Sequence, residues 1–211
     1  VIPLRCRLRA SALIRPLLEI NPRYPMTSPF QFRHAARLLH QGGVIAYPTE
    51  AVFGLGCDPL NRVAFDHLLQ IKGRAAAKGV ILIAATLEQL TPYLDPRVTL
   101  RPEIAASWPG PHTWVVAAHP HCPAWLTGGR PTIAVRVTAH VAAAALCSAF
   151  GGAIVSTSAN RSGQPPIRRV AQLQRQLGAE VDMLLHAPLG GLQSATAIRD
   201  GDSGALLRAA R

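Results

Sequence analysis

Apolar residues recur along this chain with two alternating spacings. From Phe30 they return every three or four positions until the glycine pair at 42–43, which predicts a helix with a glycine stop. The next apolar run, 44–47, is short and predicts a buried strand. The same patterns predict a glycine-bearing turn at 53–56, a helix that ends at Lys72-Gly73, a helix opened by a capping box at 86–89, helices near 98–107, 139–149 and 170–177, and strands at 80–84, 114–117, 133–137, 153–156, 183–185 and 206–207.

This alternation of strands and helices predicts an α/β domain with a mostly covered, mixed sheet. No internal repeat or linker interrupts residues 26–211, so we expect one domain there. Residues 1–25 differ in composition, because five arginines stand against a single glutamate and the continuous apolar core of a secretory signal is missing. A transit peptide or an RNA-contacting arm would have this composition, but we favour a flexible basic extension ahead of the domain.

Composition narrows the class of protein. The 211 residues are 49% hydrophobic, which suffices for a core and excludes a disordered tail. The net charge of +11 favours a polyanionic partner such as a nucleotide or a nucleic acid. Four scattered cysteines without a CxxC pair indicate a reducing, cytoplasmic setting. The uncharged stretch 141–160 is broken by glycines and polar residues, so we expect no membrane span.

Lysine is rare in this sequence. Lys72 and Lys78 are the only two lysines among twenty-two basic residues. A compact ammonium at two neighbouring positions suits a crowded phosphate site. Together with Arg74 they would place three cations at a helix end and the loop after it, where they could hold a triphosphate. A solvated basic loop is the alternative.

Polar and charged residues also stand at the ends of predicted strands or within them. The run from Ser156 to Asn160 has short polar side chains directly after a strand, which suits a ligand site and equally an ordinary turn. Arg136 lies within an apolar strand, so it either faces a cavity and holds an anion or pairs with a protein acid. Few acids are available, which favours the cavity. The one metal-like cluster, His119-Pro-His121-Cys122, lacks a fourth ligand at a usual spacing, so we expect no metal site there.

Several motifs occur in a fixed order between about Phe30 and Arg208. They are Tyr47-Pro-Thr49-Glu50 with Gly54-Leu-Gly56, Lys72-Gly-Arg74 with Lys78, Trp108-Pro-Gly-Pro, Ala134-Val-Arg136-Val, and Ser156-Thr-Ser158-Ala-Asn160 with Ser162-Gly163. Taken together they resemble the YrdC family, and most closely its short bacterial form. The shared order makes this resemblance far more specific than any single motif.

The resemblance implies a nucleotidyltransferase that makes threonylcarbamoyl-adenylate and pyrophosphate from L-threonine, bicarbonate and ATP. It implies a twisted α/β sheet with flanking helices around a deep basic cavity. Mg²⁺ on the phosphates is expected. Partner proteins of the same pathway would transfer the threonylcarbamoyl group to an adenosine of tRNA, and whether tRNA contacts this chain is left open.

The resemblance also assigns roles to individual residues. The signature tetrad of the family falls on Lys72, Arg74, Ser158 and Asn160. Threonine contacts are implied for Thr49, Arg136 and Ser156, with Arg136 on the carboxylate, and more loosely placed ligand contacts for Lys78, Thr132, Thr196 and Arg208.

Two positions leave alternatives open. Glu50 is a candidate for the magnesium or water shell and equally for a structural hydrogen bond. Ala195 stands where the family usually has serine, which puts the contact assigned to Thr196 in question.

Two rival functions belong to other classes. A non-catalytic RNA- or tRNA-binding module would explain the positive charge, although such surfaces more often show arginines spread along one face. A carbamoyl-transfer domain acting on carbamoyl phosphate is the second rival, and the lack of zinc-finger or acylphosphatase-like segments argues against it.

Overall fold

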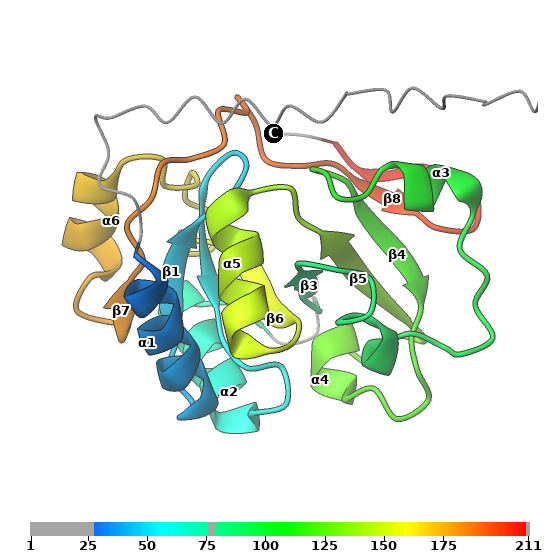
Figure 1. The fold of residues 1–211 in the computed structure, drawn as a ribbon, viewed down its shortest axis with the longest axis horizontal. Helices are drawn as coiled ribbons and strands as arrows, with labels where there is room; N and C mark the ends of the chain where they lie inside the picture. Colours follow the sequence, from blue (N-terminus) through cyan, green and yellow to red (C-terminus); the bar gives the residue numbers. More distant parts are fainter. Residues whose placement is uncertain (1–27, 76–78, 210–211) are drawn as a thin grey trace, which may run out of the picture.

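The computed structural model describes residues 28–75 and 79–209. The predictions for residues 1–25 and for Lys78 lie outside the described residues. The elements are α1 (Pro29–His40), β1 (Ile45–Pro48), β2 (Phe53–Gly56), α2 (Arg62–Lys72), β3 (Ile81–Ala84), the 3-10 helix η2 (Thr91–Tyr93), α3 (Pro102–Ala106), β4 (Thr113–Ala117), α4 (Ala124–Thr127), β5 (Thr132–Val137), α5 (Val141–Phe150), β6 (Ile154–Ser158), α6 (Val170–Leu177), β7 (Met183–Leu184), β8 (Ile198–Asp200) and β9 (Leu206–Arg208) (Figure 1).

Within the described residues the strands form one nine-stranded sheet in the order β7-β1-β2-β6-β3-β5-β4-β8-β9. The pairs β1–β7, β3–β5 and β4–β8 are parallel and the other pairs are antiparallel. The predicted α/β class with a single mixed sheet is therefore confirmed.

Helices cover both faces of the sheet because its strands alternate their side chains between two cores. In β1, Ile45 and Tyr47 pack with residues of α1 and α5, whereas Val44 before the strand and Ala46 within it belong to the core on the other face, with α2 and α6. Figure 1 shows α1 and α5 side by side over this part of the sheet, with β5, β4 and β8 extending beyond them.

The predicted helices at α1 and α2 are confirmed, and α2 has the end groups that its sequence indicates. The side chain of Asn61 accepts a hydrogen bond from the backbone N–H of Ala64 (3.0 Å) at the N-terminus. Gly73 ends the helix in the left-handed conformation, at φ 56°. Lys72 is consequently fixed on the last turn of a well-defined helix.

The predicted turn at 53–56 is wrong, because these residues form β2 between β1 and β6. Its glycines are needed for close packing, not for a turn. A Cβ on Gly56 would lie 2.8 Å from Tyr47 Cε1 and 2.8 Å from the Val155 carbonyl oxygen. Pairing on both sides stabilises the strand despite the low strand propensity of glycine.

Several other predicted elements also differ from those in the structure. Turns and η2 replace the helix expected from the capping box at 86–89, where Gln89 instead accepts from the Ala85 N–H (2.8 Å) and donates to the Cys147 carbonyl (3.2 Å). The helix expected near 98–107 is only the five residues of α3, and α4 was not expected. Strand β6 continues to Ser158, so most of the polar run lies within the strand.

The stretch 141–160 divides into α5 and β6 at Gly151, which has a φ of 83°. This is the predicted helix and strand broken at glycine. In the part of the chain that the structure describes, no helix has the length and apolar character that crossing a membrane requires.

Candidate active site

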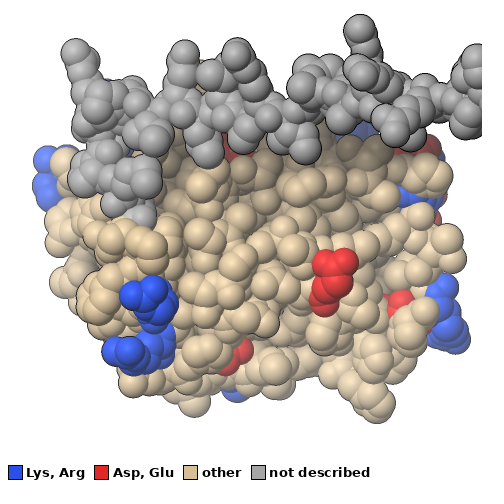
Figure 2. All heavy atoms as spheres, viewed as in Figure 1, with Lys and Arg blue, Asp and Glu red and all other residues tan. Residues whose placement is uncertain are grey.

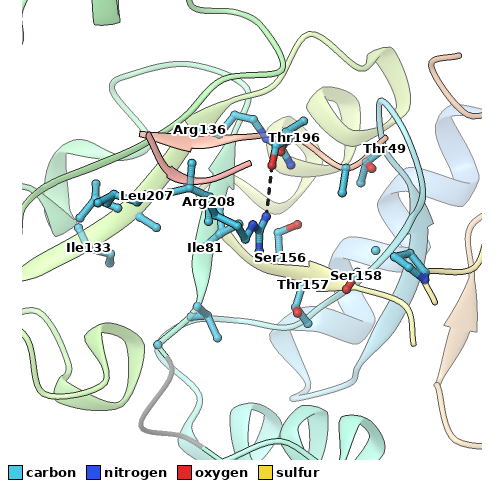
Figure 3. Close-up of a pocket in the computed structure, with 18 of the residues that line it drawn as sticks. Thr49, Ile81, Ile133, Arg136, Ser156, Thr157, Ser158, Thr196, Leu207 and Arg208 are labelled. Carbon is cyan, nitrogen blue, oxygen red and sulfur yellow. Dashed lines mark hydrogen bonds between the residues drawn. The ribbon is translucent and has the colours of Figure 1, made fainter. Parts of the chain in front are cut away.

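A cavity of about 690 Å³ opens on the sheet face that α1 and α5 cover. The register of β3, β5 and β6 shows why the cavity lies on this face. Ile83 packs in the core with α5, and its neighbour on the same side, Ile81, pairs with Ala134 and Ser156, both of which line the cavity. Where the helices end, this face of β3, β5 and β6 is therefore exposed to the cavity. Figure 3 shows Ser156, Thr157 and Ser158 in a row along β6.

Lys72 reaches this region from the far side of β6. Its ammonium donates to the backbone oxygens of Ser158 (2.5 Å) and Asn160 (2.8 Å), and to the side-chain oxygen of Asn160 at 3.4 Å. The residue is only 3% exposed and is not among those that line the cavity. Lys72 therefore fixes the turn after β6 and does not point into the cavity itself.

Ser158 and Asn160 are joined to each other as well as to Lys72. The hydroxyl of Ser158 donates to Asn160 Oδ1 (2.5 Å), and Asn160 Nδ2 donates to the Gln164 carbonyl (2.6 Å). Both residues line the cavity. These bonds hold a hydroxyl and an amide in fixed orientations where a bound molecule would meet them.

Arg74 follows the end of α2 and lines the cavity at this end. Its guanidinium donates to the Gly79 carbonyl (2.8 Å) and to the Thr157 hydroxyl (3.3 Å). Its buried Nε has no hydrogen-bond partner among the described residues. Burial, and secondly the positive charge of Arg130, lower the pKa of Arg74 from its usual value.

Arg136 stands at another part of the cavity wall. Its guanidinium donates to the Thr196 hydroxyl (2.8 Å), the bond drawn in Figure 3, and lies 3.6 Å from Glu50 Oε2. Glu50 Oε1 in turn accepts from the Thr138 hydroxyl (2.6 Å). Arg136 thus both faces the cavity and pairs with an acid, the two arrangements that its position in the strand left open.

Glu50 is buried behind the cavity wall and is not one of its lining residues. Its carboxylate contacts Arg136 and Thr138. Of the two roles that the sequence left open for Glu50, these contacts match the structural hydrogen bond. Near it, the Thr49 hydroxyl donates to the Val52 carbonyl (2.6 Å), which shapes the turn between β1 and β2. Ser156 Oγ accepts from the buried Tyr47 hydroxyl (2.7 Å).

Most residues that the sequence singled out meet at this one cavity. Those lining it are Thr49, Arg74, Thr132, Arg136, Ser156, Ser158, Asn160, Thr196 and Arg208. Lys72 lies behind the wall. Thr157, from the polar run that the sequence singled out, also lines the cavity, and so do Arg130, Gln164 and Asp200, which the sequence analysis did not name. The glycine pair at 128–129 just before Arg130 was a usable signal, because glycines often let a loop approach a ligand closely.

The lining is strongly basic. Four arginines (Arg74, Arg130, Arg136 and Arg208) contribute to it among the described residues, against one carboxylate, that of Asp200. Asp200 Oδ1 already accepts three hydrogen bonds from its own turn, from Asp202 N, Ser203 N and Ser203 Oγ. Such a lining favours an anionic ligand.

The buried Lys72 makes stability depend on pH. Burial, and secondly the charge of Arg74, lower the pKa of its ammonium to about 8, from 10.5. Between these values the unfolded chain binds more protons than the folded one, so the free energy of unfolding should rise with pH. Lys72→Met cannot ionise and should lack this rise. Urea unfolding of the wild type and of Lys72→Met at about pH 7.5 and about pH 9.5 tests this prediction. An equal change in the free energy of unfolding in the two proteins would show that Lys72 does not cause the rise.

Known proteins resemble this chain over most of its length. The family model Sua5_yciO_yrdC, described as "Telomere recombination", matches residues 37–210. A threonylcarbamoyl-AMP synthase of Halorhodospira halophila is 59% identical over 185 residues, covering 87% of this chain and 97% of the relative. One of Alkalilimnicola ehrlichii is 55% identical over 186 residues, with the same coverage.

A solved structure adds a likeness of fold. The crystal structure of P. abyssi Sua5 complexed with L-threonine superposes with a TM-score of 0.79 at 29% identity, and covers 87% of this chain. The chain spans 55% of that longer protein. From the motif order, the mixed sheet and these matches, the chain belongs to the Sua5/YciO/YrdC family.

Proposed function

We propose that this protein is an enzyme that forms threonylcarbamoyl-AMP and pyrophosphate from L-threonine, bicarbonate and ATP. One observation carries the proposal: a single basic cavity brings together Arg74, Ser158 and Asn160 at one part of its wall and Arg136 at another. The bacterial relatives bear the name of this activity, and the chain covers nearly their whole length. Residues 26–211 would form the catalytic domain.

Arg136 suits the carboxylate of threonine. A guanidinium can bind a carboxylate through two parallel hydrogen bonds. Glu50 already opposes the charge of Arg136, so this part of the wall suits a carboxylate better than a polyphosphate with several negative charges. Thr49 and Ser156 line the same cavity and would contact the rest of the amino acid, as would Thr196 beside Arg136.

Arg74, Ser158 and Asn160 suit the nucleotide. The reaction needs no nucleophilic side chain, because the threonine amine forms a C–N bond with the carbon of bicarbonate, water leaves, and a carbamate results. A carbamate oxygen then attacks the α-phosphorus, and the bond from that phosphorus to the bridging oxygen of the β-phosphate breaks. Arg74 would stabilise the charge that develops on the leaving pyrophosphate, while Ser158 and Asn160 would orient the nucleotide. Thr132 and Arg208 also line the cavity and would contribute further contacts to it.

Lys72 acts as a positioning residue in this proposal. Its three hydrogen bonds hold the backbone and side chain of the turn that carries Ser158 and Asn160. A role of Lys78 in phosphate binding stays a prediction from the sequence.

Mg²⁺ would enter with the phosphates of ATP. In the described part of the lining, Asp200 is the single carboxylate, and no cluster of three or more His, Cys, Asp or Glu side chains is placed to hold a metal ion. These residues do not make a protein site for Mg²⁺, which binds preferentially to oxygen ligands such as carboxylates and phosphates.

The test is pyrophosphate release from ATP by the full chain, with and without L-threonine and bicarbonate. Release should need both co-substrates. Arg136→Gln should raise the KM for threonine by about 10- to 100-fold, because a charge-assisted contact is lost, and leave the KM for ATP nearly unchanged. ATP turnover that is indifferent to threonine would overturn the proposal.

A non-catalytic RNA-binding module would instead bind tRNA without consuming ATP. Figure 2 shows that the described part of the face carrying α1 and α5 has separate basic groups and no continuous basic stripe. Filter binding of tRNA, together with the absence of pyrophosphate release, would support that alternative. Transfer of the threonylcarbamoyl group to tRNA by partner proteins is proposed from the relatives' activity, and would be measured by adding those proteins to the reaction.

A further inference from the structure

Arg130 lines the cavity, and neither the motifs nor the family resemblance described above assigns it a role. It follows Gly128, which ends α4, and precedes β5, so the chain brings it to the cavity mouth from a different direction than Arg74. Arg130 is exposed, whereas Arg74 is half-buried.

The two arginines meet at Gly79. Arg74 donates to the Gly79 carbonyl (2.8 Å), and Arg130 Nη2 lies 2.5 Å from the position that a Cβ on Gly79 would occupy. Gly79 also has a φ of +62°. Any larger residue there would displace the Arg130 guanidinium, so glycine permits both cations to lie against the same short piece of backbone.

Two cations held this close repel each other unless an anion lies between them. The repulsion contributes to the lowered pKa of Arg74, after burial. In addition, the buried Nε of Arg74 has no hydrogen-bond partner in the described residues, although it lies in the wall of the cavity. These features together point to a ligand that carries more than one negative charge.

The contrast with Arg136 identifies which ligand group fits where. A carboxylate, that of Glu50, already opposes the charge of Arg136. Among the described residues no carboxylate forms a salt bridge with Arg74, and Asp200, the single carboxylate of the described lining, already accepts bonds from its own turn through Oδ1. A polyphosphate has the charge and the several acceptor oxygens that two guanidinium groups can bind.

We propose that Arg130 and Arg74 together bind the β- and γ-phosphates of ATP and therefore the pyrophosphate product. The proposal rests on the proposed function for the identity of the nucleotide. It adds Arg130 as a substrate-binding residue that the family motifs do not include.

Direct binding of pyrophosphate to the full chain tests the site without relying on turnover. Titration calorimetry would compare the wild type with Arg130→Gln, and AMP would serve as a second ligand that lacks the β- and γ-phosphates. Arg130→Gln should weaken pyrophosphate binding by about tenfold or more, as expected for the loss of a charge-assisted contact, and AMP binding by less than about twofold. Arg130→Lys keeps the positive charge but lacks the paired N–H donors of the guanidinium. Its affinity for pyrophosphate should therefore lie between those of the wild type and Arg130→Gln.

Arg175→Gln is the matched control. Arg175 is exposed on the last turn of α6, outside the cavity lining, and its loss changes the net charge equally. It should bind both ligands as the wild type does. Thermal unfolding of each variant would show that the fold is retained, and Arg130→Lys carries the test should Arg130→Gln not fold.

Unchanged pyrophosphate binding in Arg130→Gln would overturn the inference, and so would an equal loss for AMP and pyrophosphate. Failure of the proposed function has a different signature. In that case the wild type would still bind pyrophosphate through Arg130 but would release none from ATP in the presence of threonine and bicarbonate.

Discussion

Lys72→Ala should reduce the rate of pyrophosphate release by about 100-fold or more, since small misplacements of positioning groups have effects of this size. The lysine is not a lining residue, but its ammonium holds the carbonyls of Ser158 and Asn160 and the side chain of Asn160. Without it, the turn after β6 loses the three hydrogen bonds that tie the carbonyls of Ser158 and Asn160 and the side chain of Asn160 to α2.

A double-mutant cycle separates positioning from direct phosphate contact. If Lys72 acts through Ser158, the change Ser158→Ala should have little further effect in a Lys72→Ala background, because both changes disrupt one network. Fully additive losses in kcat would show that Lys72 acts independently of that serine. Arg175→Ala, on the exposed side of α6, is the control for loss of a positive charge.

Glu50→Ala should lower the free energy of unfolding by about 3–5 kcal/mol, the usual cost of leaving one partner of a buried ion pair alone. Both side chains are almost inaccessible, at 6% for Arg136 and 8% for Glu50. The change would leave the Arg136 guanidinium with its bond to Thr196 but without a counter-charge.

The double variant Glu50→Ala/Arg136→Met should recover much of that loss, because no buried charge then stays uncompensated. Glu50→Gln should be milder than Glu50→Ala, since an amide oxygen can still accept from Thr138. Urea unfolding measures all of these. A Glu50→Ala variant within about 0.5 kcal/mol of the wild type would show that the pair has no such role.

Particular elements show how far the sequence alone could predict the fold. Helix α2 was predictable because its apolar spacing and the glycine at its end are local signals. Strand β2 was not, because Phe53-Gly-Leu-Gly has the composition of a turn. Its strand form depends on β1 and β6, which pair with it on both sides. The capping-box pattern at 86–89 failed since Gln89 bonds across to α5 instead of opening a helix.

For the candidate site, too, some features could be predicted from the sequence and others could not. The sequence by itself determined the order of motifs, the family they indicate and the basic character of the ligand site, because residue types and their order do not depend on the fold. Only the tertiary structure decided that Lys72 lies behind the cavity wall, that Glu50 pairs with Arg136, and that Arg130 joins Arg74 at Gly79. The physical reason is distance along the chain: such contacts join residues from separate elements, and the packing of the sheet and its helices determines which of them meet.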